Sequence, residues 1–356
     1  MKLNLLDRLD KLQAPLNVLV AVLIGFIIGT GLMLVEGHNI GEAYTALFNG
    51  AFSGRFNFGG TLERFVPLLL SGLAFAISSK ASVFNVGVEG QLYFGAMAAA
   101  YFGYTIVGLP SFLHITLVLL LAGLAGALWA LIPGFLRAAY RVNEVCTTIM
   151  LNYVAIYFTS YIVNHLFKNP HIGVPQTPNI QESARLARIL MPSRANIGVY
   201  IALGIVLFFI WLMDYTTLGY KIKTVGLNPQ FATYAGFQAR SIMVGAMVLS
   251  GFIGGITGAI QVLGIHGYFL DNFSKSLGFD GIMVALLARN NLKVLPFVAF
   301  FLAALKSGAV GMERFTGIPR ELIGIMEAVI ILFAAAEAII VIRRRLSYQK
   351  GGAEVV

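Results

Sequence analysis

The run Val18–Val35 reads VLVAVLIGFIIGTGLMLV and carries no charged residue. A helix needs about 20 predominantly apolar residues to cross a bilayer, so this run predicts a membrane-spanning helix. It is longer than the core of about 7–15 residues that is typical of a secretory signal, and no A-x-A cleavage site follows it. We therefore expect a retained span.

Similar apolar runs recur along the whole chain. Their lengths predict an all-α polytopic membrane protein with about ten transmembrane helices. Two of the runs, 65–79 and 276–288, are too short to cross as ideal helices, and short or broken spans often line a substrate path. The predicted spans are 17–35, 65–79, 88–107, 113–134, 145–164, 198–213, 241–264, 276–288, 294–311 and 321–342.

The composition excludes most soluble classes of protein. Of the 356 residues, 12% are charged and 58% are hydrophobic, whereas a soluble domain has about 25% charged residues. A soluble enzyme, a disordered chain and a disulfide-rich module are therefore excluded, and the single Cys146 cannot form an intrachain disulfide. The net charge of +9 is attributed to cytoplasmic loops rather than to nucleic-acid binding. The five histidines show no metal-ligand spacing, so neither a metal nor another cofactor is expected.

The distribution of Lys and Arg predicts the orientation. With ten spans both termini share one side, most basic residues fall on that side, and the positive-inside rule makes it the cytoplasm. Residues 1–16 carry leucines at helical spacing and predict an amphipathic lead-in helix, with an unstructured lead-in as the alternative. Residues 17–342 form the membrane domain and 343–356 a cytoplasmic tail. The loop 165–197 is expected outside and the loop 214–240 inside.

The segment Phe84–Leu92, FNVGVEGQL, places three polar side chains, Asn85, Glu89 and Gln91, at the entry to a hydrophobic span. A carboxylate at that depth is costly unless it faces water, protein or a polar ligand. One interpretation is a broken helix that lines a translocation path. The other is a hydrogen-bond network that locks two helices together. The residue pattern leaves both open.

Two later features concern helix packing. Gly251, Gly254, Gly255 and Gly258 form two overlapping small-xxx-small pairs, which predict close contact between helices. Lys306 and Glu327 lie at similar depth in consecutive predicted spans, roughly 8–9 Å from the outer ends. We expect these two side chains to approach each other as a structural ion pair, with a proton or ion relay as the alternative.

The cytoplasmic loop 214–240 contains a helix signal. Asn228 can cap a short helix that has Pro229 at its first position, and Gly236 can end it. Such a helix suits docking into a soluble partner, although an ordinary interfacial helix is the alternative. The sequence contains no G-x-x-x-x-G-K-[ST], no H-E-x-x-H and no G-x-S-x-G, so the chain is not expected to be an enzyme or to bind ATP itself.

Three segments resemble the permease subunits of ATP-binding-cassette importers, in the branch typified by ribose and nucleoside permeases. They are Phe84–Leu92, the loop Leu218–Phe237 (LGYKIKTVGLNPQFATYAGF) and Gly278–Leu287 (GFDGIMVALL). The Asn-x-Gly-x-Glu-Gly-Gln form of the first, and TIMLNY at Thr148–Tyr153, are similar to the nucleoside members, closest to guanosine or purine types. The resemblance covers nearly the whole chain.

This resemblance implies a permease in the cell membrane that moves nucleosides. It implies a cytoplasmic ATPase partner, an extracellular binding (lipo)protein and a second permease that is a different chain. It adds Asn152 and Asp280 to the pathway residues and Ala232 to the residues that couple to the ATPase. A sugar importer of the ribose type is the alternative within this architecture. An ion-coupled secondary transporter that uses Glu89, Glu327 or Glu337 is the alternative of another class.

Overall fold

The computed structural model describes residues 20–168 and 173–333. The predicted lead-in helix 1–16, the tail 343–356 and Glu337 lie outside the described residues. The chain divides into two compact units. One combines residues 1–52 with 305–356, and the other comprises residues 53–304.

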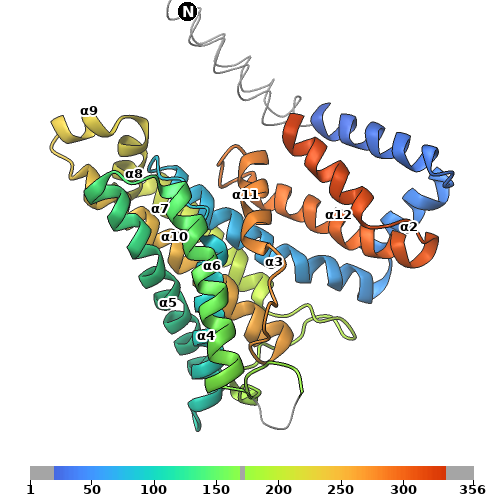
Figure 1. The fold of residues 1–356 in the computed structure, drawn as a ribbon, viewed down its shortest axis with the longest axis horizontal. Coiled ribbons are helices and arrows are strands. Elements are labelled where there is room, and N and C mark those ends of the chain that lie inside the picture. The colour runs from blue at the N-terminus through green and yellow to red at the C-terminus, as the bar shows by residue number, and fades with distance from the viewer. Residues whose placement is uncertain (1–19, 169–172, 334–356) are drawn as a thin grey trace, which may run out of the picture. The chain divides into compact units, whose positions relative to one another are not determined.

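Within the described residues the fold is helical and contains no strand, only two isolated bridges. Six helices are long and apolar enough to cross a membrane, which confirms an all-α polytopic membrane protein. They are α3 (Gly54–Ser79), α5 (Ser111–Tyr140), α6 (Glu144–Tyr161) with the π-turn Ile162–Leu166, α7 (Gly198–Tyr215), α10 (Ala239–Gln261) with the π-turn Val262–His266, and α12 (Leu295–Thr316) (Figure 1). Each remaining predicted span also contains a helix: Val20–Val35, α4 (Val88–Thr105), α11 (Leu277–Leu287) and helical residues 321–333.

The short span predicted at 65–79 is wrong. The helix α3 begins at Gly54 and has 26 residues, which is about 39 Å of helix and enough to cross. The apolar run stops at Glu63 and Arg64, but the helix continues because α3 is largely covered by its own unit and Arg64 Nη1 donates to the carbonyl oxygen of Gly60 at 3.2 Å. The prediction that the apolar run 276–288 is too short to cross as an ideal helix is confirmed, because α11 has only 11 residues.

Two helices were not predicted. They are α2 (Ile40–Phe52) and α8 (Thr217–Leu227). Both contain charged side chains, Glu42 in α2 and Lys221 and Lys223 in α8, so a criterion based on apolar runs does not detect them. The short helix predicted around Pro229 is confirmed as α9 (Pro229–Tyr234).

The helix α10 forms the centre of the larger unit, where it packs against α5, α4 and α3. The predicted close packing by glycines is confirmed. A Cβ atom added at Gly255 would overlap the carbonyl oxygen of Ala122 on α5, and one added at Gly258 would overlap that of Leu92 on α4. These glycines therefore let three helix backbones approach more closely than any side chain would permit.

Glycines also allow close helix packing in the smaller unit. Gly50 on α2 meets Gly311 on α12 so closely that neither position could carry a Cβ without displacing the other. The helix Val20–Val35 lies against helical residues 321–333, where Gly29 contacts Met326. Small residues again set the distance between helices.

Backbone hydrogen bonds join residues 173–197 to the chain between α10 and α11. Thr177 N–H donates to Phe269 O at 3.0 Å, and Leu186 N–H donates to Leu263 O at 3.0 Å. Residues 267–276 form no helix. The helix α11 begins at Leu277, and Gly278 in its first turn is buried, so the start of α11 lies inside the unit. This places a helix N-terminus among the other helices.

Candidate functional site

The residues predicted at the entry of α4 form a buried polar network. Asn85 Nδ2 donates to Gln91 Oε1 at 3.0 Å and to Ser250 Oγ on α10 at 2.8 Å. Gln91 Nε2 returns a hydrogen bond to Asn85 Oδ1 at 3.2 Å, and that oxygen also accepts from Gly87 N–H at 2.9 Å. Asn85 is 0% exposed and Gln91 is 1% exposed. These amides fix the turn between α3 and α4 against α10.

Asn152 holds the same turn from the other side. Its Oδ1 accepts from Gly90 N–H at 2.8 Å and its Nδ2 donates to Val86 O at 2.9 Å. The side chain is buried on α6. A single amide therefore satisfies backbone groups that the broken segment before α4 would leave without partners.

Glu89 lies at the N-terminus of α11. Its Oε2 accepts from Gly278 N–H at 2.6 Å and its Oε1 accepts from Ser274 Oγ at 2.6 Å. A carboxylate is stabilised there by unsatisfied N–H groups and by the helix dipole. Glu89 is 3% exposed, so protein donors replace the water that its charge would otherwise require.

Asp280, the remaining predicted pathway residue, is half-buried in the first turn of α11. Its backbone N–H donates to Ser276 O at 2.9 Å. The structure thus brings Glu89 and Asp280 to the same helix terminus, whereas Asn85, Gln91 and Asn152 gather around the turn before α4.

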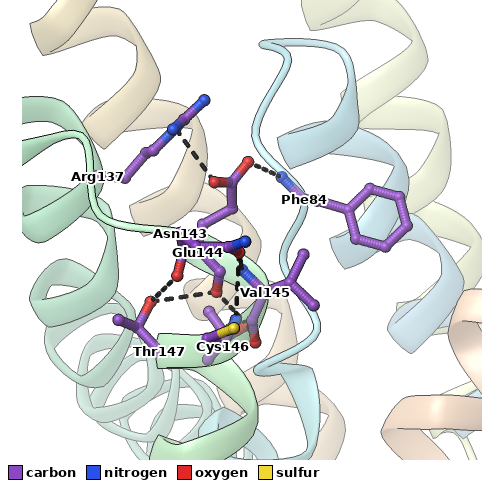
Figure 2. Close-up of polar contacts among 8 residues, drawn as sticks. Phe84, Arg137, Asn143, Glu144, Val145, Cys146 and Thr147 are labelled. Carbon is purple, nitrogen blue, oxygen red and sulfur yellow. Dashed lines mark hydrogen bonds and ion pairs between the residues drawn. The ribbon is translucent and has the colours of Figure 1, made fainter.

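A second carboxylate ties three elements together at the start of α6 (Figure 2). Glu144 Oε2 lies 3.2 Å from Arg137 Nε near the end of α5, and Glu144 Oε1 accepts from Phe84 N–H at 3.5 Å. Asn143 caps α6 by accepting from Val145 N–H at 2.9 Å. The ion pair therefore joins α5, α6 and the turn that carries Asn85.

The segment 214–240 has the predicted cap geometry. Asn228 Oδ1 accepts from Phe231 N–H at 2.9 Å, Pro229 is the first residue of α9, and Gly236 has a φ of +86° just beyond its end. Ala232 is fully buried in a small core with Val225. Asn228, Pro229 and Gly236 set the bounds of α9, and Ala232 packs α9 against α8.

Other side chains form the surface of this segment. Leu227, Phe231 and Tyr234 are 88%, 63% and 91% exposed. Phe231 and Tyr234 are three residues apart on α9 and are therefore neighbours on its surface, and Leu227 is the last residue of α8 just before it. Three large apolar side chains grouped on an exposed corner are typical of a docking surface.

Charges connect this segment to the chain between α11 and α12. Asp214 Oδ1 accepts from Lys223 Nζ at 2.8 Å, and its Oδ2 lies 2.9 Å from Lys293 Nζ. The hydrogen bond to Asp214 raises the pKa of Lys293. Burial lowers the pKa of Lys80 nearby, and the charge of Lys223 lowers it further. The ammonium groups thus concentrate around one carboxylate.

Lys306 and Glu327 approach each other as expected. Lys306 Nζ lies 3.2 Å from Glu327 Oε2. Glu327 is 7% exposed, so the cation partly compensates a carboxylate that is removed from water. Among the described residues, no group of three or more His, Cys, Asp or Glu could hold a metal ion.

Sequence reasoning identified the polar side chains at the turn but not their partners. Ser250, Ser274 and Gly278 are 165 to 189 residues away along the chain. Gly278 stands in a segment that the sequence marked, whereas Ser274 and the pairing of Glu144 with Arg137 carried no local signal. The exposed side chains of the α8–α9 corner were also missed, since periodicity alone does not show which face is free.

Comparison with known proteins gives consistent results. Residues 57–335 match the family described as branched-chain amino acid transport system / permease component. The guanosine ABC transporter permease protein NupP of Bacillus subtilis is 36% identical over 93% of this chain and 95% of its own. The nucleoside ABC transporter permease protein NupB of Lactococcus lactis is 34% identical, with 93% of each chain covered. The glucose ABC transporter permease protein TsgB13 of Haloferax volcanii is 32% identical over 89% of this chain and 85% of its own.

The comparison with solved structures found no match. The family match covers well over half of the chain, and it includes the turn before α4, the α8–α9 corner and α11. Transport permease components are membrane-embedded subunits, in agreement with the six apolar helices. The chain therefore belongs to the family of the branched-chain amino acid transport system permease components, and it is a multi-pass membrane protein.

Proposed function

We propose that this chain is the permease subunit of an ABC importer that moves nucleosides across the cell membrane. The observation that carries the proposal is the similarity to guanosine and nucleoside ABC transporter permeases over 93% of the chain. The Asn-x-Gly-x-Glu-Gly-Gln segment supports it, because its polar side chains hold the broken entry of α4 in place. ATP is hydrolysed by a separate cytoplasmic subunit.

The α8–α9 corner couples that ATPase to the membrane helices. The exposed side chains Leu227, Phe231 and Tyr234 supply the docking surface, and Asn228, Pro229, Ala232 and Gly236 give it its shape. Asp214 then links the corner to the connection before α12 through Lys223 and Lys293. A displacement at the corner is thereby transmitted to α11, next to Glu89.

The topology that goes with this function has about ten spans and both termini in the cytoplasm. An extracellular binding protein delivers the nucleoside, and a second permease, of a different sequence, completes the path. Asn85, Glu89, Gln91, Asn152 and Asp280 brace the walls of that path. Lys306 and Glu327 form a structural pair rather than a proton relay.

A sugar importer is the second candidate, and the glucose permease at 32% identity is the observation in its favour. Uptake distinguishes the two. Cells that lack their own nucleoside and glucose importers would receive this chain with its neighbouring subunits, and entry of labelled guanosine, uridine and glucose would be measured. Nucleoside entry that depends on ATP supports the proposal, and glucose entry alone refutes it. Loss of entry on collapsing the proton gradient at constant ATP would instead indicate a secondary transporter.

A further inference from the structure

The helix α6 carries a row of exposed tyrosines. Tyr153, Tyr157 and Tyr161 recur every four residues and are 57%, 70% and 58% exposed. A repeat of four residues keeps side chains on one side of a helix. The opposite side holds the buried residues Thr148 and Asn152. The tyrosines therefore face away from the helices that support α6.

The depth of this row is unusual for tyrosines that face lipid. The span Glu144–Leu166 has 23 residues, so Tyr153 and Tyr157 lie about 14 and 20 Å along a helix of about 34 Å. Tyrosines that contact lipid concentrate at the two membrane surfaces, where the hydroxyl reaches water. Within the part of the chain that the structure describes, the three hydroxyls have no hydrogen-bond partner. A phenol hydroxyl at mid-depth in hydrocarbon would be costly.

The neighbouring helix α5 provides the contrast. Its exposed side chains at comparable depth are Leu120, Leu124, Leu128 and Leu131, at 41% to 65% exposure. That face is purely aliphatic, as expected for lipid contact. Both helices have mostly exposed spans, with 33% of the α5 span and 22% of the α6 span buried, but only α6 exposes tyrosine hydroxyl groups at this depth.

A carboxylate lies at the outer end of the tyrosine row. Asp271 Oδ2 accepts from Ser160 Oγ at 3.0 Å and from Asn164 Nδ2 at 3.3 Å. Ser160 directly precedes Tyr161, and Asn164 follows it by about one turn of helix. The face thus combines aromatic rings, hydroxyl groups and one carboxylate with the apolar side chains of Met150 and Val154, which are 69% and 51% exposed, and no Lys or Arg occurs between residues 146 and 166.

We propose that Tyr153, Tyr157, Tyr161 and Asp271 line the path and bind the passing nucleoside, with the base against the tyrosine rings and the sugar hydroxyls near the hydroxyl and carboxylate groups. This inference rests on the proposed function. Aromatic rings stack on any nucleobase, so the row tolerates different bases. The lack of Lys and Arg and the presence of Asp271 disfavour a phosphorylated nucleotide. The face is thereby suited to a neutral nucleoside.

Thiol labelling in the complete importer tests this assignment. Cys146 is the only cysteine of this chain, so Cys146→Ser makes the chain cysteine-free. Nucleoside uptake by this variant is measured first, and labelling is read on this chain alone. Tyr157→Cys is then compared with Leu128→Cys, because the two positions are 70% and 65% exposed. A membrane-impermeant thiol reagent is applied with and without a mixture of guanosine, adenosine, uridine and cytidine, and separately with glucose.

We expect the reagent to label the Tyr157→Cys variant and to leave the Leu128→Cys variant unlabelled. Nucleosides should slow the labelling by the factor 1 + [L]/Kd, which is about tenfold at about ten times Kd, and glucose should not. Absence of labelling in the Tyr157→Cys variant would mean that the row faces lipid or a second subunit and would overturn the inference. Labelling that nucleosides do not slow would overturn it as well. Either result with normal nucleoside uptake leaves the proposed function intact, whereas absent uptake in the unmodified importer refutes that function.

A second pair of variants is independent of cysteine chemistry. Tyr157→Phe keeps the ring and should retain most uptake, whereas Tyr157→Leu loses the stacking surface and should weaken nucleoside binding about 10-fold, since base stacking is worth roughly 5- to 150-fold in affinity. Leu124→Ala on the aliphatic face of α5 is the matched control and should leave uptake unchanged. Equal uptake by the Phe and Leu variants would contradict a stacking role.

Discussion

Replacing Glu89 tests how strongly the start of α11 depends on one buried carboxylate. In Glu89→Ala the N–H of Gly278 and the hydroxyl of Ser274 lose their acceptor at a position where Glu89 is 3% exposed. Each buried donor left without a partner costs about 1–3 kcal/mol, so the pair costs about 2–6 kcal/mol. Removing the side chain also leaves a cavity, which adds to this loss.

Glu89→Gln separates charge from shape. The amide oxygen can accept from Gly278 N–H while the amide nitrogen donates to Ser274 Oγ, so both contacts survive. The loss of charge weakens them by about 1 kcal/mol each, but it also removes part of the cost of burying an ion. We expect a net loss of about 1 kcal/mol, which leaves a gap of about 1–5 kcal/mol between the two variants before the cavity in the Ala variant adds to it.

Thermal unfolding of the purified permease in detergent measures this gap. A difference of about 2 kcal/mol corresponds to about 3 °C in Tm for a chain of this size. Ser274→Ala is the matched control, because it removes one of the two donors and should fall between the Gln and Ala variants. If Glu89→Ala and Glu89→Gln melt within about 1 °C of each other, the carboxylate does not hold the helix terminus and the reasoning fails.

Three further predictions concern the corner, the ion pair and the glycine contacts. Phe231→Ser should abolish substrate-stimulated ATP hydrolysis by the assembled importer without affecting membrane insertion, and normal stimulation would show that the corner does not dock. Lys306→Met and Glu327→Gln should each lower the free energy of unfolding by about 1–3 kcal/mol, because each removes the opposite charge that the remaining side chain faces. The double variant should lose less than the sum of the two single losses. Losses that simply add would contradict the predicted ion pair. Gly255→Ala should lower the free energy of unfolding by about 1–3 kcal/mol, because the added Cβ clashes with backbone atoms. Gly204→Ala on α7 is the control: no atom lies within 4 Å of its added Cβ, so it should raise the free energy of unfolding by about 0.5–1 kcal/mol. Similar melting temperatures for the two variants would argue against close packing at Gly255.

Local chemistry explains what could be predicted from the sequence. Apolar runs located a helix at every expected span, because crossing hydrocarbon demands such runs. The cap at Asn228 and the stop at Gly236 were predictable, since both depend on neighbouring residues alone. The start of α3 was not, because Glu63 and Arg64 interrupt the apolar run while the helix itself extends back to Gly54.

The candidate site divides in the same way. Asn85, Glu89 and Gln91 were conspicuous as polar residues in an apolar segment, but their role as ties depends on Ser250 and Gly278, which only the folded chain brings near. The tyrosine row on α6 has a visible spacing of four residues. Its importance appears only with the exposure of each ring, which spacing does not supply.

The hydrogen bonds around the turn before α4 restrict how this permease can change shape. Asn85 ties α4 to α10 through Ser250, and Glu89 ties α4 to α11 through Gly278. Separating any of these helices would strand a buried amide or carboxylate, at a cost of several kcal/mol. The three helices must therefore move as one rigid body. Switching between inward and outward openings then requires a hinge outside this block, and the tyrosine-bearing α6 would swing with it through the clamp that Asn152 makes on Gly90.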